Sequence, residues 1–267
     1  GSRNRRSYRQ LYLNIGRTKI INHSSAKENS DNVIRVGSFE ETYNVVNENG
    51  ERSGYGYEYL QDIAGYAGWT YKYITSDWKN CFTQLENGEI DILGGISYTD
   101  ERAEKVDFAL PYMNVALGVV SHEDRVITSL DQIGADDQVI VISGTTAETY
   151  LEQNEPDIKL QKFDTYAAAK TAFENGTGVA WANDNTEVIA YAKENPGYVV
   201  GISSLGDQQS IAPAVTKGNS TLLDWINAEI ESLGEENFFH ADYEATLLDT
   251  YGADYEDTLV IEGGATK

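Results

Sequence analysis

Short runs of β-branched residues alternate with longer segments of helical period in this chain, and this alternation limits the possible folds more than any other feature. In the first part of the chain, strands are predicted at residues 33–36, 70–74 and 90–93, and helices at residues 57–67 and 79–86. A chain that alternates strands and helices in this way builds a mostly parallel sheet with helices on both of its faces.

The second part of the chain repeats this architecture after a strand predicted at residues 116–120. Its strands are predicted at 139–142, 160–163, 179–182, 199–202 and 211–216, and its helices from 147 onward and at 166–174, 186–194 and 222–233. We therefore predict an α/β protein with two lobes, each a mostly parallel sheet flanked by helices. Strands near 116–120 and 211–215 are expected to form a two-strand hinge.

The predicted lobes have definite boundaries. Residues 33–117 and 214–267 are assigned to lobe 1, and residues 118–213 to lobe 2. Residues 1–32 carry seven of the 20 Lys and Arg and show no sustained apolar period, and the leading Gly1-Ser2 resembles the remnant of a cleaved tag. We interpret residues 1–32 as a tag or leader segment outside the fold.

Charge and cysteine content exclude several classes of function. The formal net charge is −23, so a nucleic acid backbone would repel the protein. The single cysteine, Cys81, excludes an internal disulfide and is predicted to be a small buried apolar residue. His23, His122 and His240 lie far apart in the sequence. We therefore expect no catalytic residue, no metal site and no cofactor.

Ligands of open α/β sheets lie beyond the carboxyl ends of strands, so we searched those positions for binding groups. After the strand predicted at 90–93 comes the segment GGISYTDERAEKVDF. Its Gly95 would let a ligand approach the backbone, and Ser97 and Thr99 supply hydroxyl groups. Thr99 is also predicted to cap a helix that starts at Asp100.

Arg102 lies in the first turn of that predicted helix, where the helix dipole disfavours a positive charge. A guanidinium group there could bind a carboxylate in a bidentate manner. The alternative is an ordinary surface ion pair with Asp100, Glu104 or Glu41. The residue pattern alone leaves both interpretations open.

Two further strand ends carry polar groups. The segment SGTTAETYL follows strand 139–142, and its Thr145 and Thr146 could present hydroxyl and N–H groups to an anion. Thr146 and Thr149 could equally be ordinary helix-capping residues.

Asp184 follows strand 179–182 and either caps the next helix or binds an ammonium group. Together with Arg102, an ammonium-binding Asp184 would match a zwitterion.

These segments resemble those of a known family. EIDILGGISYTDERAEKVDFALPY is similar to the signature of the bacterial extracellular solute-binding proteins of family 3, which serve amino-acid ABC transporters. GTTAETYL, DNTEVIAYAKENPGYVVG and IAPAVTKGNSTLLDWINAEIESL fit the same family in the same order, so the resemblance covers about residues 33–252. It implies the two-lobed fold of type II periplasmic binding proteins.

The resemblance also implies a role for individual residues. It makes Arg102 the ligand of an α-carboxylate, with help from Ser97, Thr99 and the turn at Thr145 and Thr146.

On the same basis, Asp184 is the ligand of the α-ammonium group, with help from backbone carbonyl and hydroxyl groups near Gly95 and Ser97. Trp78 and Tyr43 match aromatic residues that line the pocket.

The function implied by the resemblance is extracytoplasmic binding of a free amino acid and its delivery to an ABC permease. The second lobe is most similar to cysteine-binding members, so cysteine or another small polar or sulfur-containing amino acid is the expected ligand. We expect a monomer in the periplasm or a lipoprotein on the cell surface. The first lobe resembles ligand-sensing domains, so the ectodomain of a histidine kinase or cyclase is an alternative, and a cyclohexadienyl-dehydratase-like enzyme is a more remote one.

Overall fold

The computed structural model describes residues 33–38, 45–46, 52–53 and 70–265 of the chain. By their contacts, the described residues divide into two units. The first unit contains the described residues up to Ser76, together with Cys81–Asn114 and the chain from Ser210 onward; the second contains Asp77–Asn80 and Val115–Gln209. The predicted leader at 1–32 and the predicted helix at 57–67 lie outside the described residues.

The first unit is built on parallel strands, as predicted. Strand β1 (Val33–Ser38) pairs in parallel along its whole length with β4 (Thr70–Thr75) and, at Val36, with β5 (Ile92–Ser97). Strand β11 (Tyr198–Thr216) then pairs antiparallel with β5 and with the short β6 (Val106–Phe108).

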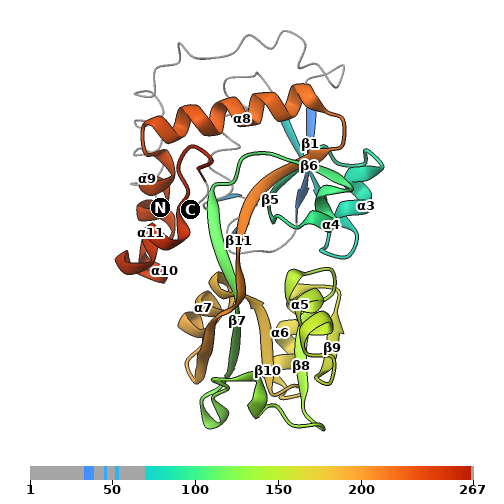
Figure 1. Cartoon of the computed structure of the whole chain (residues 1–267), viewed down its shortest axis with the longest axis vertical. Helices are drawn as coiled ribbons and strands as arrows, with labels where there is room; N and C mark the ends of the chain where they lie inside the picture. Colours follow the sequence, from blue (N-terminus) through green and yellow to red (C-terminus); the bar gives the residue numbers. More distant parts are fainter. Residues whose placement is uncertain (1–32, 39–44, 47–51, 54–69, 266–267) are drawn as a thin grey trace. The chain divides into compact units, whose positions relative to one another are not determined.

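The helices of the first unit come from both of its chain segments. Figure 1 labels these helices: α3 (Cys81–Glu86), α4 (Asp100–Ala103), α8 (Ser220–Glu235), α9 (Phe238–Thr246), α10 (Leu248–Tyr251) and α11 (Glu256–Leu259). Cys81 is fully buried, which confirms the predicted role of this residue.

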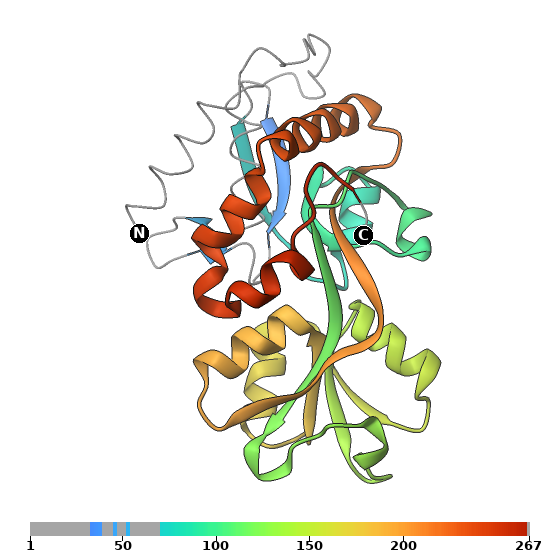
Figure 2. The ribbon, with the colours of Figure 1, turned by 60° about the vertical axis from the view of Figure 1, so that its left-hand side comes forward.

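The second unit contains β7 (Met113–His122) from Val115 onward, β8 (Gln138–Ile142), β9 (Lys159–Phe163) and β10 (Ala180–Asp184). β8 pairs in parallel with both β9 and β10, and β10 pairs antiparallel with β7. The helices that connect the strands are α5 (Thr146–Asn154), α6 (Tyr166–Glu174) and α7 (Asn185–Glu194), and they lie on both faces of the strands (Figure 2).

Alternating side chains of β8 show why helices cover both faces. Val139 and Val141 belong to a buried cluster that includes Leu151 of α5, whereas Ile140 belongs to a second cluster with Phe173 of α6. Successive side chains of a strand point to opposite faces, so a run of apolar residues is stable only when both faces are covered. The run QVIVI therefore fixes β8 in the middle of its unit.

Several strands differ from their predictions. The short strand β6 was not predicted, and β7, expected at 116–120, begins at Met113. β5 was expected to end at residue 93, but it continues to Ser97 and contains Gly94 and Gly95. The strands expected at 199–202 and 211–216 are parts of the single strand β11. The polar segment between them is mostly exposed and still extended, and periodicity does not reveal such a segment.

The chain passes between the units within β7 and β11, after Asn114 and after Gln209. The predicted lobe boundaries, at residues 117 and 213, lie in the same two strands and stay a prediction. One difference concerns Asp77–Asn80, which the contacts assign to the second unit although the prediction placed them in lobe 1.

A buried carboxyl group lies on the apolar face of α8. Glu229 is 6% exposed among the buried residues of that helix, and burial raises the pKa of its carboxyl group to about 7. The folded protein thus holds the Glu229 proton at pH values where the unfolded chain, with a carboxyl pKa near 4.5, has lost it. As far as Glu229 is concerned, the free energy of unfolding is therefore highest below about pH 4.5, and it declines as the pH rises toward 7.

We therefore predict that Glu229→Gln stabilises the protein at pH 8 by about 1 to 3 kcal/mol relative to wild type, and changes little at pH 4.5. Chemical denaturation at both pH values measures this difference. Glu231→Gln removes an exposed carboxyl from the same helix and is the control. An equal effect of Glu229→Gln at both pH values would contradict the prediction.

Candidate functional site

In the first unit, the predicted binding residues gather where β5 leads into α4. Ser97 is the last residue of β5 and is 3% exposed, and Thr99 caps α4 by accepting a hydrogen bond of 3.0 Å from the backbone N–H of Arg102. The predicted cap and the start of α4 at Asp100 are confirmed. β1, β4 and β5 run parallel, so Ser97 lies at the carboxyl edge of the first unit's sheet.

Arg102 folds back over the strand that precedes it. Its guanidinium Nη1 donates to the backbone carbonyl of Ser97 at 2.9 Å, and its Cζ lies 4.6 Å from the centroid of the Phe82 ring. The carbonyl oxygen and the face of the ring both carry partial negative charge, which stabilises the guanidinium cation. α4 has only four residues and Arg102 lies in its last turn, so the expected conflict between this cation and the helix dipole is corrected by the structure. Phe82 was not identified from the sequence as part of this site, because only the packing of α3 against the turn brings it there.

Gly95 has a structural reason to be glycine. A Cβ atom at this position would lie 2.0 Å from the hydroxyl oxygen of Tyr112, which donates a hydrogen bond of 3.1 Å to the carbonyl of Gly94. The Tyr112 side chain is fully buried, and its ring stacks on Phe239 with centroids 5.6 Å apart. The space above Gly95 therefore accommodates Tyr112.

In the second unit, the predicted anion-binding turn joins β8 to α5. Thr145 is the capping residue: its hydroxyl donates to the carbonyl of Ile142 at 2.7 Å and accepts from the N–H of Glu148 at 3.4 Å. Thr146, which together with Thr149 was one possible cap of a helix predicted from Ala147, is instead the first residue of the helix. The pairing of Thr145 with Glu148 explains the shift, because the Glu148 carboxylate in turn accepts from the N–H of Gly144.

Trp78 also belongs to this part of the second unit. Its side chain packs against the cluster that contains Phe173 and Trp181. Gly144 has a positive φ of 84°, and a Cβ there would lie 2.4 Å from the Trp78 carbonyl oxygen, so glycine is required on both grounds. Trp78 and the Thr145 turn are thus close neighbours.

Asp184 is the last residue of β10 and occupies the N-cap position of α7, but its side chain makes no capping hydrogen bond. Its backbone N–H is bound by the side chain of Asn183 at 2.8 Å. The capping interpretation is therefore wrong. β10 and β8 are parallel neighbours, so Asp184 lies at the same edge of the sheet as the turn at Thr145.

Tyr43, predicted as a second aromatic residue of the pocket, lies outside the described residues.

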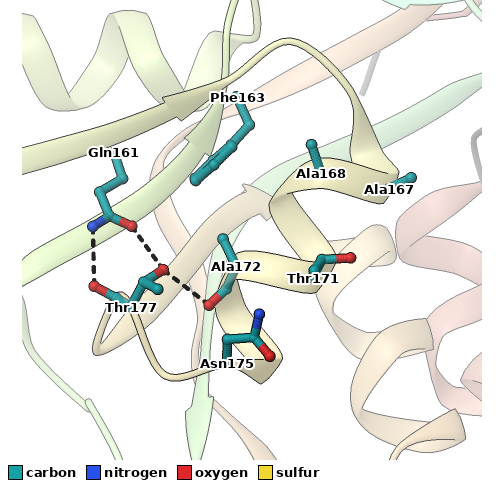
Figure 3. Close-up of a pocket in the computed structure, with 8 residues that line it drawn as sticks. All are labelled: Gln161, Phe163, Ala167, Ala168, Thr171, Ala172, Asn175 and Thr177. Atoms are coloured by element: carbon teal, nitrogen blue, oxygen red, sulfur yellow. Dashed lines mark hydrogen bonds between the residues drawn. The ribbon is translucent and has the colours of Figure 1, made fainter.

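A hollow of about 610 Å³ is present in the second unit, between β9 and α6 (Figure 3). Its polar end is a network in which the Thr177 hydroxyl bonds to the Gln161 side chain at 2.9 Å and to the Ala172 carbonyl at 2.9 Å. None of the predicted binding residues lines this hollow.

The structure brings together three side chains that could hold a metal ion, which ligand spacing in the sequence did not reveal. Possible ligand atoms of His240, Glu256 and Asp257 lie within 4.8 Å of one another. His240 Nδ1 lies 2.8 Å from the Glu262 carboxylate, and Nε2 lies 3.5 Å from that of Asp257. The same contacts also describe a cluster of polar side chains that joins the end of the described chain to α9, and the backbone N–H of His240 donates to the Glu262 carboxylate at 2.6 Å.

Comparison with known proteins identifies the class to which these two α/β units belong. The family model of the bacterial extracellular solute-binding proteins, family 3, matches residues 34–244. The chain belongs to this family, as its resemblance implied. Among the described residues, no helix has both the length and the apolar character needed to cross a membrane.

A curated relative is the ABC transporter glutamine-binding protein GlnH of Bacillus subtilis (strain 168). It is 29% identical over 174 residues, which cover 65% of this chain and 63% of that protein. The chain therefore matches less than two thirds of this relative's length.

Two solved structures are similar over more of the chain. The solute receptor for L-cysteine of Neisseria gonorrhoeae has a TM-score of 0.83 and 38% identity, and covers 87% of this chain and 97% of its own. The cysteine-binding protein of Campylobacter jejuni has a TM-score of 0.82 and 36% identity, and covers 87% and 96%. Both confirm the predicted fold class.

We predict that Gly95→Ala destabilises the protein by about 1 to 3 kcal/mol, because the added methyl group must displace the Tyr112 hydroxyl. Tyr112→Phe removes that hydroxyl, so the double variant should lose less stability than the sum of the two single variants. Urea denaturation of the four proteins measures this coupling. Strict additivity would show that Tyr112 does not require a glycine at this position.

Proposed function

We propose that this protein binds a free amino acid and passes it to an ABC permease. The observation that carries the proposal is the environment of Arg102, whose guanidinium group is held at the carboxyl edge of the first unit's sheet by a carbonyl and an aromatic ring. A guanidinium group held in this way is suited to bidentate binding of a carboxylate. Arg102 is proposed as the ligand of the amino acid's carboxylate, with Ser97 and Thr99 beside it.

The second unit is proposed to supply the partner of the ammonium group. Asp184 lies at the end of β10, and a carboxylate at a strand end can bind an ammonium group through charge-assisted hydrogen bonds. The turn at Thr145 and Thr146 lies at the same edge of the sheet, and Trp78 packs beside that turn. A guanidinium group and a carboxylate match the two charges of a zwitterion.

Cysteine is the first ligand to test, followed by other small polar or sulfur-containing amino acids. Support comes from the two similar structures, both of which are named for cysteine, at 38% and 36% identity. The relative named for glutamine supports an amino acid as the ligand but does not favour cysteine. The proposal is for binding without catalysis, since the relatives compared are named as binding proteins and receptors.

We predict that L-cysteine under reducing conditions, at 100 times its dissociation constant, stabilises the protein by about 2.7 kcal/mol. For a protein of this size the melting temperature should rise by roughly 5 to 10 °C. A thermal-shift series with the twenty amino acids and cystine measures this. If none of them raises the melting temperature at millimolar concentration, the proposal is wrong.

The two charged residues should respond to different parts of the ligand. We predict that Arg102→Ala weakens the binding of cysteine by about 2 to 5 kcal/mol and affects the binding of its decarboxylated analogue, cysteamine, much less. Asp184→Asn should weaken the binding of cysteine more than that of its deaminated analogue, 3-mercaptopropionate. Isothermal titration calorimetry gives the affinities.

Matched controls are available on the surface of the second unit. Arg125→Ala removes an arginine that pairs with Asp137, and Asp157→Asn neutralises an exposed carboxylate. Neither control should change the affinity for cysteine. If an Arg102 or Asp184 variant lost equal affinity for cysteine and for the corresponding analogue, the role assigned to that residue would be contradicted.

A further inference from the structure

Phe82 forms the aromatic contact of Arg102. The guanidinium carbon of Arg102 lies 4.6 Å from the centroid of the Phe82 ring, within the distance of a favourable cation–π interaction. Both side chains are half-buried, which reduces competition from water. The contact joins α3 to α4, two short helices on opposite sides of β5 in the sequence.

The ring is held on a well-anchored helix. Cys81 and Leu85, on either side of Phe82 in α3, are both fully buried. The backbone carbonyl of Leu85 accepts a hydrogen bond of 3.0 Å from the hydroxyl of Thr216 in β11. These contacts fix the position of α3 and therefore the position of the Phe82 ring that the guanidinium group contacts.

Arg102 is fixed at two further points. Its Nη1 donates to the Ser97 carbonyl, and its backbone N–H donates to the Thr99 hydroxyl. An arginine side chain has considerable rotamer entropy, and a ligand that had to order it would bind more weakly. Contacts that orient the side chain before the ligand arrives remove this cost.

We infer that Phe82 is a positioning residue of the carboxylate site, and that its aromatic face, more than its bulk, sets the orientation of Arg102. The inference rests on the proposed function, in which Arg102 binds the ligand's carboxylate. A leucine at position 82 would keep most of the apolar contact but would lose the cation–π attraction, whereas a tyrosine would keep both.

The test compares L-cysteine with L-cysteine methyl ester, which keeps the ammonium and thiol groups but lacks the carboxylate. Calorimetry under reducing conditions gives both dissociation constants for the wild type, Phe82→Leu and Phe82→Tyr. The informative quantity is the dissociation constant of the ester divided by that of the acid, which we call the preference for the acid over the ester. We expect Phe82→Leu to lower this preference by roughly 3- to 30-fold, and Phe82→Tyr to keep it within about twofold.

A purely structural role for Phe82 predicts a different result. General loosening of the site would weaken the acid and the ester by the same factor and leave the preference unchanged, and that result would overturn the inference. Phe163→Leu shortens a half-buried aromatic residue of the second unit and should change neither affinity. Should Phe82→Leu fail to fold, as judged by circular dichroism, Phe82→Met provides the same comparison with a flexible apolar side chain.

The outcomes separate the inference from the proposed function. If neither the acid nor any other amino acid binds the wild-type protein, the proposed function fails and the inference fails with it. If the wild type binds cysteine and the Phe82 variants keep its preference for the acid, only the inference fails.

Discussion

Burial of both faces of the central strands is the constraint on which the rest of this structure depends. In β8, odd and even residues contact different helical layers, so no polar side chain can be placed inside the strand without losing its solvation. The one polar residue of β8, Gln138, lies at the start of the strand, and the candidate binding groups Ser97 and Asp184 likewise lie at the ends of β5 and β10.

Within that constraint, Arg102 illustrates how contacts from several elements fix one side chain. It lies in the last turn of the four-residue helix α4. The Ser97 carbonyl and the Phe82 ring contact its guanidinium group, and the Thr99 hydroxyl accepts a hydrogen bond from its backbone N–H. These contacts restrict the orientation of the guanidinium group.

Much of the fold could be predicted because its signals are local. The short strand patterns of β1, β4, β8 and β9 and the helical period of α6 and α8 predicted the positions of these elements to within two residues at each end. The predictions failed where distant groups decide. β5 extends through two glycines because β11 pairs with it as far as Ser97, and β11 stays extended through a polar segment that has no alternating pattern.

The sequence by itself determined the alternation of strands and helices, the cap at Thr99 and the family to which the chain belongs, since each depends on residues close together in the chain or on motifs in a fixed order. Only the tertiary structure decided which groups surround Arg102, why position 95 is glycine, and that Asp184 does not cap its helix. These outcomes depend on contacts between segments that meet only when the chain packs. Local propensity carries no information about such contacts.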